Sequence, residues 1–360
     1  MNRIKVDSDG LKQIMKIIGP CTGKKTGLYV NVQIAHKDNR LTIRGMNGTF
    51  VGEMSMKVPG GEGDTFCIDA DMFTKVINLN NGDVEILTDG KNCVLKGIGR
   101  MRIPIVAANV NEPDRLNGET VTMKAEHFKS VYKLVSYAKA TDESRPLLTG
   151  VLIESDGDRL RMVAIDGFQI AIENAPCSGD CMEVIVPGSF MDLVASAVTP
   201  GEEIDLITNG RLIQVKTDSM TLQCPLLVGN YLDYKKLIPE SFQTECMIFT
   251  DRLMDALKSS SIVNNKLGTV KLSVRDNSIT VSNNSQYADF EDKIPCDMTG
   301  NDIRIAFNEH YLMNTIGAVN TDKAVMKFNR SVSPVFVQAK GSDGIHILTP
   351  VKINEVLQDG

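Results

Sequence analysis

Residues 148–176 read LTGVLIESDGDRLRMVAIDGFQIAIENAP, and two other parts of the chain repeat their pattern. Residues 27–59 read GLYVNVQIAHKDNRLTIRGMNGTFVGEMSMKVP, and residues 267–295 read LGTVKLSVRDNSITVSNNSQYADFEDKIP. Each segment contains an alternating strand, a polar turn, a second strand, a polar break, a third strand and a proline. The second strands begin 119 residues apart, at Leu41, Leu160 and Ile279. The sequence therefore predicts three copies of one structural repeat.

An amphipathic helix is predicted before each hairpin, because apolar residues recur there at the helical period. These helices should cover Leu11–Ile18, Phe128–Ala138 and Leu253–Ile262, with Ser8 and Thr250 as signals for their N-terminal ends. A second helix is expected around Phe73, Phe190 and Tyr311. Each third should run β-α-β-β-β-α-β-β-β, with two helices packed on antiparallel sheets in an α+β fold. We place the domain boundaries in polar, proline-bearing stretches, which gives domains 1–119, 120–243 and 244–360.

The composition is that of an ordinary globular protein, with 360 residues of which 42% are hydrophobic and 23% charged. No segment approaches the ~18 apolar residues that span a bilayer, and MNRIKVDSDG lacks the apolar core of a secretory signal. We therefore expect a cytoplasmic protein without a membrane partner. The balance of 39 basic and 45 acidic residues argues against a general nucleic-acid coat, but it leaves open a basic surface inside an acidic exterior.

Residues that could carry catalysis or bind a metal are sparse. Of eight cysteines only Cys177 and Cys181 lie close together, so we expect reduced thiols, with a redox or metal pair at these two as the alternative. The four histidines are not spaced as metal ligands, and the segment GPCTGKK at 19–25 is an imperfect phosphate loop. We expect no catalytic residue, no metal and no cofactor.

Lysines recur at one position of the first helix in every repeat, where Lys16, Lys133 and Lys258 align. A solvated helix face explains any single lysine stripe, but the threefold recurrence favours contact with phosphates without sequence readout. The candidate DNA-facing residues are Lys12, Lys16, Lys24, Lys129, Lys133, Arg145 and Lys258.

Several motifs resemble those of one family. LRMVAIDGFQIA at 160–171, after Leu148-Thr149-Gly150, is similar to the pattern L-x-x-V-A-T-D-G-H-R-L-A of bacterial DNA polymerase III beta subunits, the DNA sliding clamps. NYLDYKKLIP at 230–239 resembles their F-P-D-Y-x-x-L-I-P, SVSP at 331–334 their S-x-S-P, and ILTPVK at 347–352 their L-M-P-V-R. The order and spacing of these motifs extend the resemblance over the whole chain.

The resemblance implies three repeated DNA-clamp domains and a head-to-tail homodimeric ring that encircles double-stranded DNA irrespective of sequence. Such a clamp is not an enzyme. It is a processivity factor that tethers the DNA polymerase III alpha subunit, the clamp-loader complex and other proteins with a clamp-binding motif, and so raises their local concentration at DNA.

The resemblance also implies two protein-binding surfaces. The partner-peptide groove would be formed by Leu148, Ile165, Gly167, Phe168, Gln169, Ile170, Leu232, Lys236, Leu237, Asn308, Tyr311, Val332, Pro334, Ile347, Leu348, Thr349, Pro350, Val351 and Lys352. The dimer interface would include Ile98, Arg100, Ile262 and Val263.

The motifs depart from the family pattern at four groove positions. Ile165 replaces Thr, Phe168 replaces His, Gln169 replaces Arg and Leu232 replaces Pro. The groove is therefore expected to be more apolar and less positive than in relatives. Arg100 stands where relatives often carry an apolar residue, so we expect a weaker or more ionic dimer interface.

Two other classes of function stay open at this stage. One is a repeat-built scaffold that never encircles DNA, which the placement of the aligned lysines on one concave surface would argue against. The other is a hydrolase, which perturbed carboxylates converging in one pocket would favour.

Overall fold

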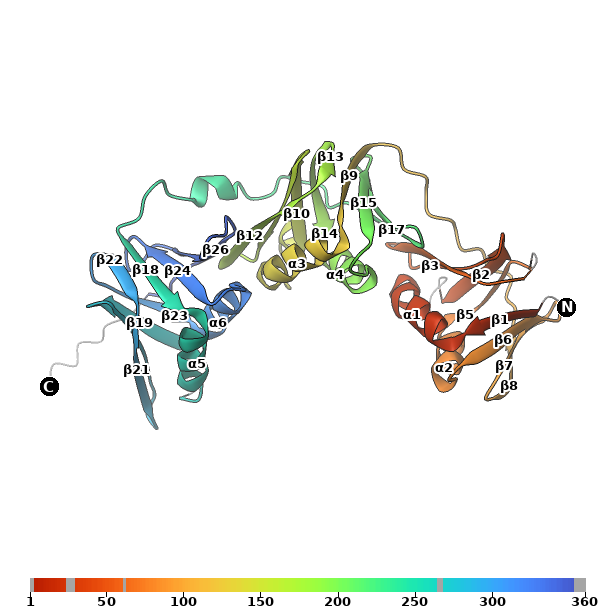
Figure 1. Ribbon diagram of the computed structural model, residues 1–360, viewed down its shortest axis with the longest axis horizontal. Helices are drawn as coiled ribbons and strands as arrows, with labels where there is room; N and C mark the ends of the chain where they lie inside the picture. The colour runs from red at the N-terminus through yellow and green to blue at the C-terminus, as the bar shows by residue number, and fades with distance from the viewer. Residues whose placement is uncertain (1–2, 24–29, 61–62, 264–267, 353–360) are drawn as a thin grey trace. The chain divides into compact units, whose positions relative to one another are not determined.

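The structure is a computed structural model that describes residues 3–23, 30–60, 63–263 and 268–352 (Figure 1). The chain forms two compact units. The N-terminal unit comprises Met1–Phe128, Ser155–Asp158 and Cys177–Leu226, and the C-terminal unit comprises Lys129–Glu154, Arg159–Pro176 and Leu227–Gly360. The middle repeat thus contributes to both units.

The elements of the first repeat follow one another along the N-terminal third of the chain, with η denoting a turn of 3-10 helix. They are β1 (Arg3–Asp7), α1 (Ser8–Ile18), η1 (Gly19–Cys21), β2 (Asn31–Lys37), β3 (Arg40–Met46), β4 (Val51–Lys57), β5 (Phe66–Asp69), α2 (Ala70–Leu79), β6 (Asp83–Thr88), β7 (Asn92–Gly97) and β8 (Gly99–Pro104).

The second repeat has the same order of elements, with η3 and β13 in addition. It contains β9 (Glu119–Lys124), α3 (Ala125–Val135), η2 (Ser136–Ala138), η3 (Pro146–Thr149), β10 (Gly150–Asp156), β11 (Arg159–Ile165), β12 (Gln169–Pro176), β13 (Ser178–Gly179), β14 (Cys181–Pro187), α4 (Gly188–Ala197), β15 (Glu203–Thr208), β16 (Leu212–Lys216) and β17 (Met220–Pro225). The turn η4 (Tyr234–Leu237) lies in the connection that follows.

The third repeat completes the series. It contains β18 (Thr244–Phe249), α5 (Thr250–Ser261), β19 (Thr269–Arg275), β20 (Ser278–Asn284), β21 (Asp289–Pro295), β22 (Asp297–Gly300), β23 (Ile303–Asn308), α6 (Glu309–Ala318), β24 (Lys323–Phe328), β25 (Val335–Ala339) and β26 (Ile345–Leu348).

The predicted element order missed strands before the second helix: repeat 1 has one additional strand there, and repeats 2 and 3 have two each, because β13 and β22 are also present. The additional strand next to the helix is β5, β14 or β23. β5 pairs with β2 and β23 pairs with β19, so each one extends a hairpin sheet. The apolar residues of these short strands run directly into the helix, so periodicity did not separate the two elements.

Two sheets organise the N-terminal unit. One has the strand order β1-β6-β7-β8, and the other β13-β9-β15-β16-β17-β4-β3-β2-β5. In the second sheet, β17 of repeat 2 pairs antiparallel with β4 of repeat 1, from Met220 opposite Met54 to Gln223 opposite Val51. A continuous sheet therefore joins two repeats.

The C-terminal unit repeats this arrangement. Its strands follow the order β10-β11-β12-β26-β25-β24-β18-β22 in one sheet and β21-β20-β19-β23 in the other. Here β12 of repeat 2 pairs antiparallel with β26 of repeat 3, from Gln169 opposite Leu348 to Ile172 opposite Ile345. Within the described residues, β8 and β21 each lie at the edge of their sheets.

Helices pack in pairs against the sheets, with α1 beside α2 and α5 beside α6 (Figure 1). The predicted apolar face of α1 is buried, including Leu11 and Ile18 at 0% exposure. In repeat 3, Leu253 and Leu257 of α5 join Phe307 in an equivalent core. Amphipathic helices on half-buried strands thus produce a core in each of these repeats.

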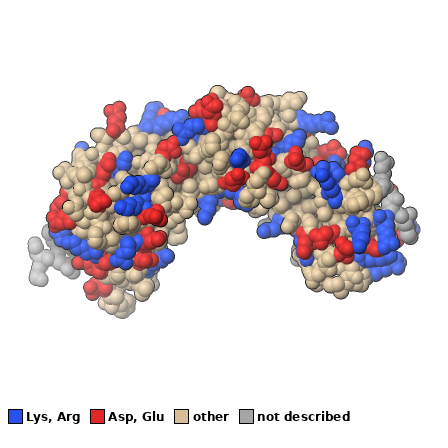
Figure 2. All heavy atoms as spheres, in the orientation of Figure 1, with Lys and Arg blue, Asp and Glu red and all other residues tan. Residues whose placement is uncertain are grey.

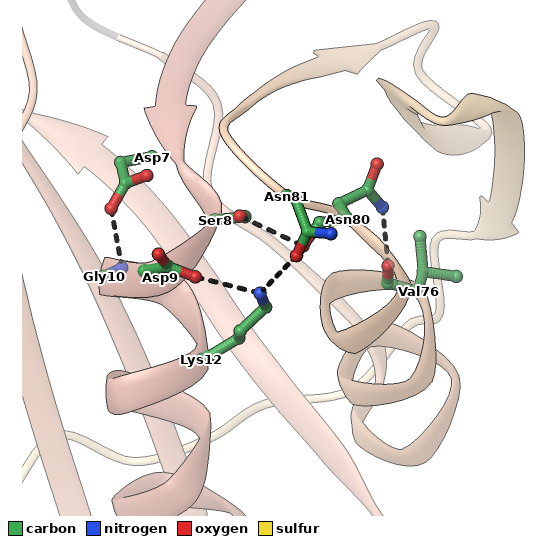
Figure 3. Close-up of polar contacts among 8 residues, drawn as sticks. All are labelled: Asp7, Ser8, Asp9, Gly10, Lys12, Val76, Asn80 and Asn81. Atoms are coloured by element: carbon green, nitrogen blue, oxygen red, sulfur yellow. Dashed lines mark hydrogen bonds and ion pairs between the residues drawn. The ribbon is translucent and has the colours of Figure 1, made fainter.

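The start of α1 is held differently from the prediction. Its N-cap is Asp7, whose carboxylate accepts a 3.0 Å hydrogen bond from the Gly10 amide. Ser8 instead donates its hydroxyl to the Asn80 carbonyl after α2, at 3.2 Å (Figure 3). Thr250 does the same in repeat 3, where its hydroxyl donates to the Thr321 carbonyl at 2.8 Å. These hydroxyls fix one helix of each pair to the end of the other.

All eight cysteines are free thiols, and most are buried in the apolar cores. Burial raises the pKa of Cys21 and of Cys93 to about 12, so both stay protonated at neutral pH. Among the described residues, no helix has the length and apolar character that a bilayer crossing requires.

Candidate functional site

The predicted groove residues of repeats 2 and 3 meet within the C-terminal unit, at the pairing of β12 with β26. Ile170 lies opposite Ile347, and Gln169 lies opposite Leu348. β26 also pairs with β25 on its other side, where Val335 lies opposite Leu348. Antiparallel pairing therefore brings together residues nearly 180 positions apart in the sequence.

A tight turn precedes β12 and presents Phe168. The Asp166 carboxylate accepts hydrogen bonds from the amides of Phe168 and Gln169, both at 2.7 Å. Gly167 has a φ of +99°, a conformation that favours glycine. The Thr349 amide donates to the Phe168 carbonyl at 2.9 Å, and its hydroxyl donates to the same atom at 3.0 Å. The turn is thus anchored from both repeats.

Phe168 and Tyr311 form the apolar surface at this junction. Their rings stack at a centroid distance of 5.6 Å, with 56% of Phe168 exposed. Tyr311 lies in the first turn of α6, where the Asn308 side chain caps the helix by accepting from its amide at 3.1 Å. Burial raises the pKa of the Tyr311 hydroxyl, so this group is neutral.

Several predicted groove residues form the floor beneath this surface and do not reach solvent. Ile165, Gln169, Ile170, Ile347 and Leu348 are all buried, each 7% exposed or less. The Gln169 side chain donates a hydrogen bond from Nε2 to the Asp166 carboxylate at 3.1 Å. The Gln169 side chain therefore points into the protein.

A buried polar cluster, which the sequence analysis missed, lies behind the floor. His346 Nε2 is 3.2 Å from the Glu173 carboxylate, and Tyr137 Oη is 3.1 Å from His346 Nδ1. Glu173 belongs to β12, His346 to β26 and Tyr137 to η2. Burial raises the pKa of Tyr137. This cluster adds polar contacts to the junction between the two repeats. No local sequence motif predicts it, because its three residues come from separate elements.

The connection between the repeats carries Leu232, Lys236 and Leu237, all exposed. It is attached to repeat 2, since Lys235 pairs with Glu154 at 2.7 Å and Tyr231 donates to the Gly150 carbonyl at 3.3 Å. Leu148 is half-buried at η3 of the same repeat.

The remaining predicted groove residues belong to repeat 3. The Val351 amide donates to the Ala306 carbonyl at 2.8 Å, so Val351 and Lys352 run beside β23. Val332 is 64% exposed on the loop between β24 and β25, and Pro334 and Pro350 are half-buried. Phe168, Tyr311, Thr349 and Val351 thus lie in one connected region.

The candidate DNA-facing residues divide into two groups. Lys16, Lys133 and Lys258 are exposed in the last turns of α1, α3 and α5, as the repeat alignment predicts. Lys12 pairs with Asp9 at 2.9 Å and donates to the Asn81 side chain at 3.4 Å (Figure 3). Lys129 is half-buried on α3. Figure 2 shows acidic and basic side chains interspersed on the face in view.

Another member of that set, Arg145, directly precedes η3. Arg145 lies beside the turn that precedes β12, because its Nη1 is 3.0 Å from the position that a Cβ on Gly167 would occupy. Lys24 lies outside the described residues.

Of the candidate interface residues, Ile98 and Ile262 are 73% and 83% exposed, Arg100 is exposed on β8, and Val263 is half-buried. Exposed isoleucines at sheet and helix ends suit a protein contact.

The described residues contain no group of three or more His, Cys, Asp or Glu side chains placed to hold a metal ion. The perturbed carboxylates among them are accounted for by structural partners. The pKa of Glu154, which burial would raise, is lowered by hydrogen bonds from Lys235 and Tyr234. A carboxylate held by a lysine and a tyrosine in this way stabilises structure, so it gives the hydrolase alternative no support.

Comparisons with known proteins agree on one family. Residues 122–233 match the model for the central domain of the DNA polymerase III beta subunit, and residues 235–352 match the model for its C-terminal domain. The "Beta sliding clamp" of Streptomyces coelicolor is 28% identical over 275 residues, 73% of each protein. The "Beta sliding clamp" of Lactococcus lactis is 22% identical over 98% of this chain and 100% of its own.

Solved structures give the same fold. The DNA polymerase III beta subunit of Thermotoga maritima aligns with a TM-score of 0.90 at 21% identity, over 98% of this chain and 100% of its own. The DNA polymerase sliding clamp of Bacillus subtilis aligns with a TM-score of 0.90 at 18% identity, over 98% of this chain and 99% of its own.

Proposed function

The chain belongs to the DNA polymerase III beta subunit family, and we propose from this premise that it is a DNA sliding clamp. Two copies would form a head-to-tail ring around double-stranded DNA and tether a DNA polymerase to it. The protein would then act as a non-catalytic processivity factor in the cytoplasm. The domains would be residues 1–119, 120–243 and 244–360.

One observation carries the proposal of a closed ring: the same strand junction occurs twice within the chain. The third hairpin strand of one repeat pairs with the last strand of the next, as β4 with β17 and β12 with β26. Within one chain this pairing leaves two strands without a partner: β21, the third hairpin strand of repeat 3, and β8, the last strand of repeat 1. Both strands lie at the edges of their sheets. A head-to-tail contact between two copies would pair them, and two such contacts would close a ring.

The register of this contact follows from the repeats. Both internal junctions use equivalent residues, because Gly52 and Ala171 occupy one repeat position while Leu222 and His346 occupy another. Transferred to the open edges, this register sets Phe290 opposite Met101.

The neighbouring pairs in this register are ionic. Glu291 falls opposite Arg100, and Asp289 falls opposite Arg102, and all four side chains are exposed in the single chain. Opposite charges on facing strands stabilise a pairing and fix its register. This register agrees with the more ionic interface expected from Arg100 and assigns Glu291 as its partner, which the sequence did not predict.

Exposed apolar residues extend the same surface. Tyr287 is the repeat equivalent of Phe168, and Met72 is the equivalent of Tyr311. Tyr287 is 87% exposed and Met72 is 43% exposed. We infer that they meet across the dimer interface, as Phe168 and Tyr311 meet within the chain, with Ile98, Ile262 and Val263 nearby.

Partners would bind at the Phe168–Tyr311 region. An apolar surface with a buried floor, flanked by a few polar groups, suits a short peptide with hydrophobic anchors. The DNA polymerase III alpha subunit, the clamp-loader complex and other proteins with such a motif would compete for it. Lys16, Lys133 and Lys258 would contact DNA phosphates without reading bases.

Retention on DNA tests the function as a whole. The protein is placed on nicked circular plasmid by a bacterial clamp loader, and the plasmid is then washed in high salt with or without linearisation. A ring should stay on the circle and leave the linear form through its ends, because topology holds it when phosphate contacts are screened. Equal release from both forms would favour the scaffold alternative.

A further inference from the structure

A polar pocket of about 660 Å³ opens next to the proposed groove. Its lining includes Arg304, Arg330 and Lys352, with Asp302 as its one acidic residue. Arg304 is on β23, Arg330 follows β24, and Lys352 lies past β26. Three separate segments of repeat 3 thus direct positive charge to one hollow.

These three cations have no ion-pair partner among the described residues, although the chain as a whole carries a net charge of −6. Because Asp302 is the single acidic residue beside three cations, the pocket has an excess of positive charge, which a bound anion would neutralise. The guanidinium groups of Arg304 and Arg330 can each bind a carboxylate through two parallel hydrogen bonds.

The pocket is continuous with the groove. Val332 and Lys352 line the pocket and also belong to the groove set. Arg304 and Asn308 lie four residues apart on β23, so they share one face of that strand. Val351 pairs with Ala306 between them, which carries Lys352 along β23 toward Arg304. One strip of surface therefore runs from the Tyr311 cap to the basic pocket.

We propose that this basic pocket receives an acidic segment of the partner peptide, adjoining the hydrophobic anchors that bind at Phe168 and Tyr311. The inference rests on the proposed function, since it needs a peptide in the groove. A peptide is favoured over DNA because the pocket lies between strand ends and loops and continues the groove, whereas the proposed DNA contacts are on helices. Carboxylates beside the anchors would select among partners.

Matched peptides test the proposal on the full-length protein. Each carries the same hydrophobic anchors, with three aspartates or three serines placed at the N-terminal or the C-terminal end. For one of the two ends, fluorescence anisotropy at low salt should show that the aspartate peptide binds roughly tenfold more tightly than the matching serine peptide. This difference between aspartate and serine peptides should be smaller at high salt.

Protein variants assign the effect to the pocket. The Arg304→Ser, Arg330→Ser double variant should lose the discrimination and keep its affinity for the serine peptides. A control double variant, Arg275→Ser with Lys340→Ser, removes two exposed cations of repeat 3 outside the pocket and should keep the discrimination.

The contrary outcomes are distinguishable. Equal affinity of the wild type for aspartate and serine peptides overturns the acidic-segment proposal and leaves the groove intact. No binding of any peptide overturns the groove itself. If the pocket variant keeps peptide discrimination and loses affinity for a short DNA duplex, the pocket contacts DNA and the proposal is wrong.

Discussion

The β17–β4 junction of the N-terminal unit and the β12–β26 junction of the C-terminal unit occupy equivalent positions but are filled differently. Gly52 lies opposite Leu222 in the first, and a Cβ on Gly52 would be 2.7 Å from Cys21 Sγ. Ala171 lies opposite His346 in the second. The first junction is close-packed around Gly52, whereas the second encloses the polar contacts of His346.

The aromatic residues differ by a single step in register. Phe50 contacts the buried Phe190 at 5.5 Å in the first junction, while the exposed Phe168 stacks on Tyr311 in the second. Phe50 is the repeat equivalent of Gln169, and Phe168 comes one residue earlier. Both residues lie in the turn before the third hairpin strand, where this one-position difference gives a half-buried ring in the first junction and an exposed ring in the second. A packing contact thereby becomes a potential binding surface.

The largest effect is expected at the third junction, which needs a second chain. Glu291→Arg sets two arginines opposite each other in the proposed β21–β8 pairing, and should weaken dimerisation roughly 100-fold or more. Sedimentation velocity at low micromolar concentration should then show monomers. Adding Arg100→Glu restores the pair and should restore the dimer. Arg275→Glu, on an exposed strand end away from that edge, is the control. A dimeric Glu291→Arg variant would refute the register.

Phe190→Ala breaks the first junction from inside. Its side chain is 0% exposed, so truncation should cost about 3–5 kcal/mol of stability by leaving a cavity. Chemical denaturation measures this cost. Affinity for a groove peptide should not change, because Phe190 belongs to the other junction. A loss of peptide affinity in a variant that is still folded would contradict the separation of the two junctions.

Phe168→Ala should have the opposite profile at the second junction. Its ring is largely exposed, so stability should change by less than about 1 kcal/mol, while peptide affinity falls by about 1–3 kcal/mol. Calorimetric titration with one peptide measures the loss. Leu348 and Ile170 are less suitable, because both are buried and their truncation would confound folding with binding. Unchanged affinity in Phe168→Ala would move the site elsewhere.

The smallest effect concerns a pair of equivalent arginines. Arg159 pairs with Asp343 across the second junction and lowers the pKa of that carboxyl. A carboxyl with a depressed pKa stabilises the fold above its ordinary pKa, and this contribution disappears as the pH falls through the folded value. Arg159→Gln should cost about 0.5 kcal/mol or less at pH 7, because both groups are about half exposed, and this cost should decrease as Asp343 becomes protonated.

Arg40 provides the comparison for this pH dependence. It is the repeat equivalent of Arg159, but it donates to the Asp218 carbonyl at 3.1 Å and to Ser55. Neither acceptor titrates in acid. Denaturation of Arg40→Gln and Arg159→Gln between pH 3 and pH 7 should therefore show a pH-dependent difference from wild type for Arg159 alone. The same pH dependence in both variants would contradict the assignment to Asp343.

Much of the fold could be predicted because local patterns are repeated. The 119-residue interval of Leu41, Leu160 and Ile279 matches the observed β3, β11 and β20, and the apolar face of α1 is buried as expected. The extra strand before each second helix was missed because its residues merge with the helix. The caps were misjudged because Ser8 and Thr250 bond to a distant carbonyl, which helix signals do not encode.

The candidate site was only partly predictable. Family motifs identified Phe168, Tyr311 and Thr349, which lie together, but they did not separate the exposed Phe168 from the buried Gln169. Arg304 and Arg330 belong to no motif, and they share a pocket with Lys352 only through the packing of repeat 3. His346 likewise meets Glu173 through strand pairing between repeats.

The sequence alone determined the threefold repeat, the amphipathic helices and the alternating strands, because these depend on residues a few positions apart. It also determined the family, because the motifs are recognised from their residues, order and spacing in the sequence. Only the tertiary structure decided which strands join repeats, which aromatic ring faces solvent and which charges converge. The strand pairings depend on antiparallel registers between residues more than 150 positions apart, and the exposed ring and the converging charges depend on how turns and separate segments pack together.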